Sequence, residues 1–402
     1  MKYFFLLVLI ATCVLQAQWI PLNSSFGKRI SGLHVEGNTI IASTDSNGVY
    51  FSSNGGQTWT QRNSGITNLR VLSLAKRNNI IAAGTYGAGV FISTNNGSSW
   101  SVSTNGMTLP YIFALYITQN NNIFAGSGGY GGYISTNMGS NWTTNLLTTY
   151  VVNCYTITPA GYYLCGAGPR IYKSTNEGTS WSQLASGNAA MEDIITIPKV
   201  GGGFNILVGS SDGMFISTNE GVSWSEINSG IAYRIINSLA ASGTNVFAGS
   251  HGGGVYLTTN NGTNWTAINT GLTNLFVMKL FIDGAYIYAG TENGVIWRRE
   301  LSQVITSIED EIEDLNSFSL HQNYPNPFNP STNLSFVIGH SSFVSLKVFD
   351  VLGKEVATLV DEFRNAGAYE INFDASDLPS GIYFYRMTAG NFTETKKMIL
   401  TR

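Results

Sequence analysis

The side chains with the greatest chemical potential are arginine, aromatic and acidic residues that recur at two places of a repeated unit. One place is the loop between the second and third predicted strands of the unit, and the other is the start of its first strand. Binding residues concentrate on such loops, and arginine and aromatic side chains carry much of the energy of interfaces. Asp45 and Phe276 also occupy these places. The pattern predicts a ligand face made of Arg29, Arg70, Tyr86, Tyr130, Arg170, Asp212, Arg234, His251 and Glu292.

Catalytic chemistry has weaker support in the sequence. A glycosidase needs two facing carboxylates, and Asp45, Asp212 and Glu292 are the acids that such a site would have to pair across the centre of the fold. The four histidines are scattered without ligand spacing, and no glycine-rich loop opens a helix that holds phosphate. We therefore expect no catalytic residues, no metal and no cofactor.

The composition indicates an all-β protein. Of the 402 residues, 45 are glycine and 11% are charged, while a hydrophobic fraction of 43% allows a sizeable core. Low charge with abundant glycine, asparagine, serine and threonine suits short strands joined by tight turns. The formal net charge of -3 gives no basic face, so we expect no binding to nucleic acid.

An octad repeated six times positions the candidate loops. Its copies cover residues 52–59, 93–100, 135–142, 174–181, 217–224 and 258–265, with the pattern Ser/Thr-x-Asn-x-Gly-x-x-Trp. The successive tryptophans are 41, 42, 39, 43 and 41 residues apart, a period that fits a four-stranded propeller blade. Asparagine bonds its own backbone and glycine supplies a positive φ, so each octad predicts a structural turn. The turn residues are Asn54, Trp59, Asn95, Trp100, Asn137, Trp142, Asn176, Trp181, Asn219, Trp224, Asn260 and Trp265.

Counting the first strands gives seven units. The seventh stops at Trp297 and lacks both the octad and the outer strand. The segment 18–24 resembles the outer strands of other units, and Trp19 lies 40 residues before Trp59, in phase with the repeat. We predict a seven-bladed β-propeller over residues 18–303, in which the N-terminal strand completes the last blade and removes exposed sheet edges.

The octads resemble the Asp-box, or bacterial neuraminidase repeat, Ser-x-Asp-x-Gly-x-Thr-Trp. That repeat also occurs in sortilin-type receptors, xyloglucanase-type glycoside hydrolases and photosystem II assembly factors. The resemblance implies a propeller whose boxes are structural and lie at the blade periphery. Every copy in this chain carries asparagine where the family has aspartate, which keeps the turn and removes a charge.

The chain after residue 303 is a separate module. An acidic linker over residues 304–316 precedes three closely spaced prolines and several alternating strands, which predict a small β-sandwich over 317–402. The motif Tyr324, Pro325, Asn326, Pro327 and Phe328 and the later strands closely resemble the type A C-terminal sorting domain of the type IX secretion system. The resemblance implies export across the outer membrane by the type IX machinery, followed by release or attachment at the cell surface.

Residues 1–17 are predicted to be a signal peptide. Lys2 precedes an apolar run over 4–14, which is too short to span a bilayer as a permanent helix, and Ala17 precedes the predicted cleavage site. No transmembrane span is expected. The signal predicts transit through the periplasm.

Two cysteines lie on either side of a predicted turn in the fourth unit. A hairpin turning at Pro159 would place Cys154 and Cys165 directly opposite each other, within reach of a disulfide if the side-chain geometry cooperates. The favoured interpretation is two small core residues, because Ala114 and Ala125 hold the same places in the preceding unit.

Together these patterns predict an exported, non-catalytic propeller that binds a protein or a carbohydrate at the cell surface or outside the cell. One alternative is a secreted glycoside hydrolase of sialidase or xyloglucanase type, and sialidase chemistry would require three arginines and a Tyr–Glu pair to converge. A second alternative is a structural surface adhesin. The sequence does not identify the ligand.

Overall fold

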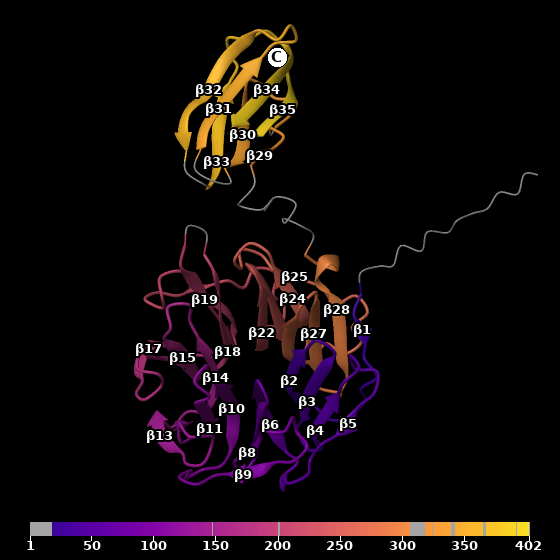
Figure 1. The fold of residues 1–402 in the computed structure, drawn as a ribbon, viewed down its shortest axis with the longest axis vertical. Coiled ribbons are helices and arrows are strands. Elements are labelled where there is room, and N and C mark those ends of the chain that lie inside the picture. Colours follow the sequence, from indigo (N-terminus) through magenta and orange to yellow (C-terminus); the bar gives the residue numbers. More distant parts are fainter. Residues whose placement is uncertain are drawn as a thin grey trace, which may run out of the picture. The chain divides into compact units, whose positions relative to one another are not determined.

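The computed structural model describes residues 18–146, 148–199, 202–305, 318–323, 325–338, 342–364, 367–390 and 392–401. These residues are all-β apart from one 3-10 turn, η1 (Leu301–Gln303), which confirms the predicted fold class at that level. The chain divides into two compact units, Met1–Ile305 and Thr306–Arg402 (Figure 1). The predicted signal peptide, most of the predicted linker and Tyr324 lie outside the described residues. None of the described helical residues forms a segment able to cross a bilayer.

Seven four-stranded sheets make up the described part of the first unit, and we number them by their order along the chain. Sheets 1 to 4 contain β2 (Ile30–Glu36), β3 (Thr39–Thr44), β4 (Gly48–Ser52), β5 (Thr60–Gln61); β6 (Val71–Arg77), β7 (Ile80–Thr85), β8 (Val90–Ser93), β9 (Ser101–Ser103); β10 (Ile112–Ile117), β11 (Ile123–Ser127), β12 (Gly132–Ser135), β13 (Thr143–Leu146); β14 (Val152–Ile157), β15 (Tyr163–Ala167), β16 (Arg170–Ser174) and β17 (Ser182–Ser186). Sheets 5 to 7 contain β18 (Met191–Pro198), β19 (Phe204–Ser210), β20 (Gly213–Ser217), β21 (Ser225–Glu226); β22 (Ile236–Ser242), β23 (Asn245–Ser250), β24 (Gly254–Thr258), β25 (Thr266–Ala267); β26 (Val277–Asp283), β27 (Tyr286–Thr291), β28 (Ile296–Glu300) and β1 (Ile20–Pro21).

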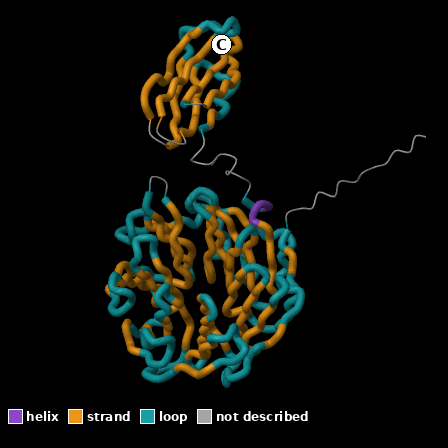
Figure 2. Tube along the Cα trace, in the orientation of Figure 1, coloured by secondary structure: helices purple, strands orange, loops and turns teal. Residues whose placement is uncertain are grey.

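The sheets have a propeller-like arrangement. Each is an antiparallel meander whose first strand lies toward the centre of the unit, as β6, β10, β14 and β18 show in Figure 1. The first strand of every sheet contacts the first strand of the next, and β2 of sheet 1 also contacts β26 of sheet 7. Sheet 7 obtains its fourth strand from the N-terminus, because β1 pairs with β28 in the register Ile20 to Arg298. Loops join the strands at the two ends of each sheet (Figure 2).

The octads form self-contained turns. In the first octad, Asn54 Oδ1 accepts hydrogen bonds from Ser52 Oγ at 2.9 Å and from the Thr58 N–H at 3.0 Å. The Gly56 N–H donates to Ser52 Oγ at 2.9 Å. The same hydroxyl–asparagine bond recurs in the other five octads. The turn is therefore satisfied by its own side chains, as the pattern of serine, asparagine and glycine predicts.

A tryptophan seals the junction between two successive sheets. The Trp100 backbone N–H donates to Ser64 O at 2.9 Å, and its indole Nε1 donates to Arg62 O at 2.9 Å. Gly65 lies against this tryptophan with φ of +95°, and a Cβ there would come within 2.0 Å of Trp100 O. Trp265 and Trp19 make the corresponding two donations across their own junctions, and Trp142 donates from its backbone N–H to Asn105 O and from Nε1 to the Ser103 hydroxyl. At these four junctions the loop after the outer strand thus receives the tryptophan of the next sheet.

The predicted register of the two cysteines is wrong. Cys154 pairs with Gly166, and Cys165 pairs with Tyr155, because the strands pair Ile157 with Tyr163 across the turn at 158–162, one residue out of the predicted register. Neighbouring positions of a strand face opposite sides of the sheet, so the two thiols are not cross-strand partners. Both cysteines are free and buried, in agreement with the interpretation as small core residues.

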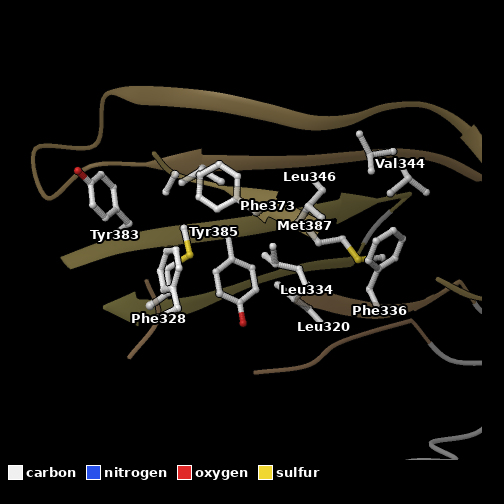
Figure 3. Close-up of a cluster of buried hydrophobic side chains, with 14 of the residues drawn as sticks. Leu320, Phe328, Leu334, Phe336, Val344, Leu346, Phe373, Tyr383, Tyr385 and Met387 are labelled. Carbon is white, nitrogen blue, oxygen red and sulfur yellow. The ribbon is translucent and has the colours of Figure 1, made fainter. Parts of the chain in front are cut away.

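The second unit contains two sheets packed on one core. They are formed by β29 (Ser319–Leu320), β30 (Ser331–Ile338) and β33 (Gly367–Asp374), and by β32 (Glu355–Arg364), β31 (Ser342–Phe349), β34 (Gly381–Ala389) and β35 (Phe392–Leu400). Leu334 and Phe336 from the first sheet meet Leu346, Tyr385 and Met387 from the second (Figure 3).

The predicted sorting motif packs against the last strand of this unit. Phe328 is buried, and its backbone N–H donates to Ile399 O at 3.0 Å. Asn326 Oδ1 accepts from the Ile399 N–H at 2.9 Å. Tyr385 Oη accepts from the Asn323 N–H at 2.8 Å and donates to His321 O at 2.6 Å. The segment before β30 is therefore part of the fold of the second unit.

The tryptophan junction predicts a large cost for one added methyl group. We expect Gly65→Ala to lower the thermal midpoint because the new Cβ collides with Trp100 O in addition to the strain of a positive φ, which alone costs about 1–3 kcal/mol. Gly161→Ala is the matched control, since Gly161 has φ of +83° but no heavy atom within 4 Å of a Cβ. Thermal unfolding of both variants measures the difference. Equal losses would show that the close approach of loop and tryptophan is unimportant for stability.

Candidate functional site

The structure brings the loops of the predicted ligand face together in pairs. Isolated β-bridges join Asp45 to Arg70, Tyr86 to Tyr111, and His251 to Phe276. In each pair the first residue follows the second strand of one sheet, and the other precedes the first strand of the next sheet. The two places that the sequence analysis singled out therefore meet at the sheet junctions.

Four of these residues form a continuous cluster across sheets 1, 2 and 3. Arg70 Nε lies 2.7 Å from Asp45 Oδ1, and the Arg70 guanidinium carbon lies 4.0 Å from the centre of the Tyr86 ring. The Tyr86 ring meets Tyr111 edge-on at 4.8 Å. The bond with Asp45 raises the pKa of Arg70, so the guanidinium stays charged. The cluster presents a cation and two aromatic rings at an exposed surface.

Apart from the backbone of Arg29, the other predicted residues do not join this cluster in the interactions that the structure records. Arg234 Nη1 lies 3.7 Å from Asp212 Oδ1 at the junction of sheets 5 and 6, and the His251 ring meets Phe276 at 4.9 Å one junction further on. Arg170 lies over the Tyr150 ring at 5.1 Å. The backbone of Arg29 accepts from the Asp45 N–H, and the Glu292 N–H donates to Phe276 O, while the side chain of Tyr130 is exposed.

Exposed apolar side chains gather on the same loops. Tyr86 is 41% exposed, Tyr130 52%, Tyr233 55% and Phe276 40%. Leu69, Ile235 and Leu275 lie beside them in sequence and are also exposed. Aromatic and arginine side chains of this kind are enriched where proteins bind partners.

A cavity of about 150 Å³ lies between the first strands of six sheets. Its charged lining residues are Glu192 and Asp193 on β18 and Lys279 on β26. Asn153 Nδ2 donates to Glu192 Oε2 at 3.3 Å. Asp193 accepts from the Leu239 N–H at 2.8 Å, so this carboxylate connects sheet 5 to sheet 6.

Burial dominates the electrostatics of this centre. It raises the pKa of Glu192, although Lys279 and Arg29 act in the opposite direction. Burial also raises the pKa of Asp193 against the effects of Lys279 and the hydrogen bonds from sheet 6. His34 is half-buried beside Phe281, and burial lowers its pKa to about 4, which makes it a neutral packing residue at neutral pH.

The sequence analysis missed the central charges because it considered only loops. The available signal is the pair of adjacent acids itself, since Glu192 and Asp193 occupy strand positions where the preceding unit has Asn153 and Cys154. Among the described residues no cluster of histidine, cysteine and acids suits a metal ion.

The comparisons with known proteins identify the tail. Residues 322–401 match the family described as the secretion system C-terminal sorting domain. The predicted resemblance of this stretch is thereby confirmed, and the tail marks the chain for export to the cell surface or beyond. No curated protein sequence matches the chain.

Solved structures share the fold at low sequence identity. PorZ, a surface component of the type-IX secretion system of Porphyromonas gingivalis, aligns with a TM-score of 0.54 and 14% identity over 93% of this chain and 60% of its own. YCF48 bound to the D1 peptide aligns with a TM-score of 0.55 and 16% identity over 70% of this chain and 96% of its own. A xyloglucanase from Xanthomonas campestris aligns with a TM-score of 0.55 and 15% identity over 80% of this chain and 59% of its own. These likenesses support a propeller-like fold.

The buried carboxyl of Glu192 predicts a pH-dependent stability. A raised pKa means that the ionised form destabilises the folded state above that pKa, and this cost disappears as the pH falls toward the ordinary value of 4.5. We expect Glu192→Gln to raise the thermal midpoint at pH 7, with an advantage that shrinks as the pH approaches 4.5. The exposed Glu177→Gln is the control. A glutamine variant that is less stable at pH 7 would contradict this electrostatic assignment.

Proposed function

We propose that the chain is an exported, non-catalytic binding protein whose first unit is a closed, seven-bladed propeller of the Asp-box type. The sheets counted above would be the blades, and the pairing of β1 with β28 together with the contact of β2 with β26 supports closure. The proposed boundaries are 1–17 for the signal peptide, 18–303 for the propeller, 304–316 for the linker and 317–402 for the sorting sandwich.

The proposed ligand is a protein or a carbohydrate. The observation that carries this proposal is the concentration of exposed aromatic, apolar and arginine side chains on the loops of one face, with the Arg70–Tyr86–Tyr111 cluster among them. The aromatic side chains among them supply rigid contact area with little loss of conformational entropy. YCF48, which shares the fold, has been solved with a bound peptide, and this supports a polypeptide ligand here as well.

The alternative function is that of a glycoside hydrolase, and the likeness of the fold to a xyloglucanase is the reason to consider it. Two observations favour the non-catalytic function. Arg70 and Arg234 each lie beside an acid at their own sheet junction, where a sialidase would need arginines free to hold a substrate carboxylate. Asp45, one of the candidate catalytic acids, is engaged by Arg70 at 2.7 Å.

The binding proposal predicts that ligand affinity depends on the Arg70–Tyr86 pair. The purified chain is screened on a glycan array and a peptide library, and we expect the double variant Arg70→Ala/Tyr86→Ala to weaken the selected ligand at least tenfold, the loss typical of an interface anchor. Arg298→Ala/Tyr286→Ala is the matched control, because it removes a similar pair with 4.6 Å between the guanidinium carbon and the ring centre. Equal losses in both variants, or turnover of any glycoside, would refute the proposal.

The sorting tail predicts where the chain accumulates. Deletion of residues 317–402 removes the matched domain, so the truncated chain should remain in the periplasm of a host with the type IX system. Immunoblots of periplasm, cell surface and medium measure its distribution. Leu352→Ala, at a position that is 90% exposed in the second unit, should leave export unchanged. Release of the truncated chain into the medium at the normal level would contradict the role of the tail.

A further inference from the structure

Six of the seven sheet junctions in the first unit contain a large apolar side chain beneath the second sheet of the junction. The outer strand of the preceding sheet, or the loop after it, supplies this residue, which we call the junction side chain. Ile66, for example, lies among Val49, Val71, Ala83, Phe91 and Trp100 at the junction of sheets 1 and 2. The junction side chains are Phe26, Ile66, Met107, Leu146, Ile231 and Leu272.

The junction of sheets 4 and 5 differs from these six. The residues that correspond to the surroundings of Ile66 line a cavity of about 240 Å³ at this junction. The correspondence follows from the strand registers, since Val71 pairs with Thr85 at the start of sheet 2 as Met191 pairs with Ser210 at the start of sheet 5. The corresponding lining residues are Ile171, Met191, Val208, Phe215 and Trp224.

The sequence explains why no large side chain fills this cavity. Val71 lies twelve positions after Trp59, whereas Met191 lies only ten positions after Trp181. The loop after β17 is therefore too short to supply a residue corresponding to Ile66. The junction of sheets 3 and 4 has the same short spacing, but Leu146, four residues after Trp142, fills it. The corresponding residue in sheet 4 is Ala185, whose methyl group leaves the cavity open.

The walls of the cavity are more exposed than their counterparts at two other junctions. Trp100 and Trp265 are 5% and 2% exposed, and Phe91 is completely buried, whereas Trp224 and Phe215 are only half-buried. The equivalent tryptophans of sheets 1 and 4 are half-buried as well, so this junction is distinguished by its accessible apolar wall together with the missing junction side chain. Burial of this wall by an incoming side chain is favourable because the wall is already formed and needs little ordering.

The junction of sheets 7 and 1 shows which side chain suits this cavity. There the indole of Trp59 donates to its own turn, to Gly56 O, and Phe26 stacks on Tyr50 at 4.1 Å and meets Trp59 edge-on at 5.1 Å. The indole of Trp224 also donates to its own turn, to Gly221 O at 3.1 Å, so Trp224 is oriented as Trp59 is. Phe215 takes the position of Tyr50. Phe26 is therefore the closest internal template for an occupant.

We propose that the cavity between sheets 4 and 5 binds an aromatic side chain carried by a polypeptide partner. The ring stacks on Phe215 and meets Trp224 with its edge, as Phe26 does at its own junction. Three polar residues of the cavity wall can contact the backbone that carries the ring, namely Ser186, Asn188 and Glu226. This inference deepens the proposed function, because it names a second site and a ligand class for a binding propeller.

The test uses the template segment as a probe. The acetylated and amidated peptide of residues 22–28, Leu-Asn-Ser-Ser-Phe-Gly-Lys, is titrated into the full chain by calorimetry, alongside the same peptide with Phe26→Ala. We expect the phenylalanine peptide to bind at least tenfold more tightly, the change expected for burial of one aromatic side chain. Equal binding of the two peptides, or no binding of the phenylalanine peptide, overturns the proposal.

Variants of the cavity make the test specific. Ala185→Leu copies Leu146 and fills the cavity from within, so it should abolish binding of the phenylalanine peptide and raise the thermal midpoint by about 2 °C or more. Ala189→Leu fills it from the loop if the first variant folds poorly. Ser182→Leu, on the exposed part of β17, is the control and should bind as the unmodified chain does. Undiminished binding in both filled variants overturns the proposal.

The outcome is distinguishable from that of the proposed function. Arg70→Ala/Tyr86→Ala alters the loops of the ligand face and should leave peptide binding at the sheet 4–5 junction unchanged. A failure of the peptide to bind therefore removes the junction site alone.

Discussion

The structure of the first unit depends on covering both faces of small sheets. A four-stranded sheet has two apolar faces and cannot bury either by itself, so each sheet has to pack against its neighbours. The contacts of Ile66 and Trp100 show how this chain meets the requirement: a side chain from one sheet fills the space beneath the next, and two N–H groups of the tryptophan satisfy the carbonyls of the loop. Gly65 is necessary because the loop backbone and the tryptophan approach too closely for a Cβ.

The same requirement explains the role of the N-terminal segment. Sheet 7 ends without an outer strand of its own, and its last strand would expose an unpaired edge. β1 pairs with that edge, while Phe26 fills the junction with sheet 1 a few residues later. One short segment thus performs two tasks that the loop and the outer strand share elsewhere in the unit.

The sequence was informative where a local pattern determines the structure and uninformative where packing does. The octads were predictable because Ser52, Asn54 and Gly56 satisfy one another within a few residues. The register of Cys154 was not, because a difference of one residue in the pairing across the turn at 158–162 is enough to change its partner. The difference between Trp100 and Trp224 was also hidden, since the similar octads of sheets 1 and 4 precede loops of unequal length. Glu192, Asp193 and Lys279 of the central cavity are present in the sequence, but no local pattern distinguishes them as residues of a site.

The asparagine of the octads is consistent with a division of tasks between the two sides of the first unit. Aspartate would accept the same two hydrogen bonds but would add a negative charge at every turn. Asn54 instead donates from Nδ2 to Thr58 Oγ1 at 2.8 Å, and the corresponding bonds recur in three other octads. In these four turns the asparagine amide is saturated by the turn itself, with little left to attract a polar ligand. In the proposed function, recognition is carried by the exposed arginine and aromatic loops on the other side and by the open junction beside Trp224.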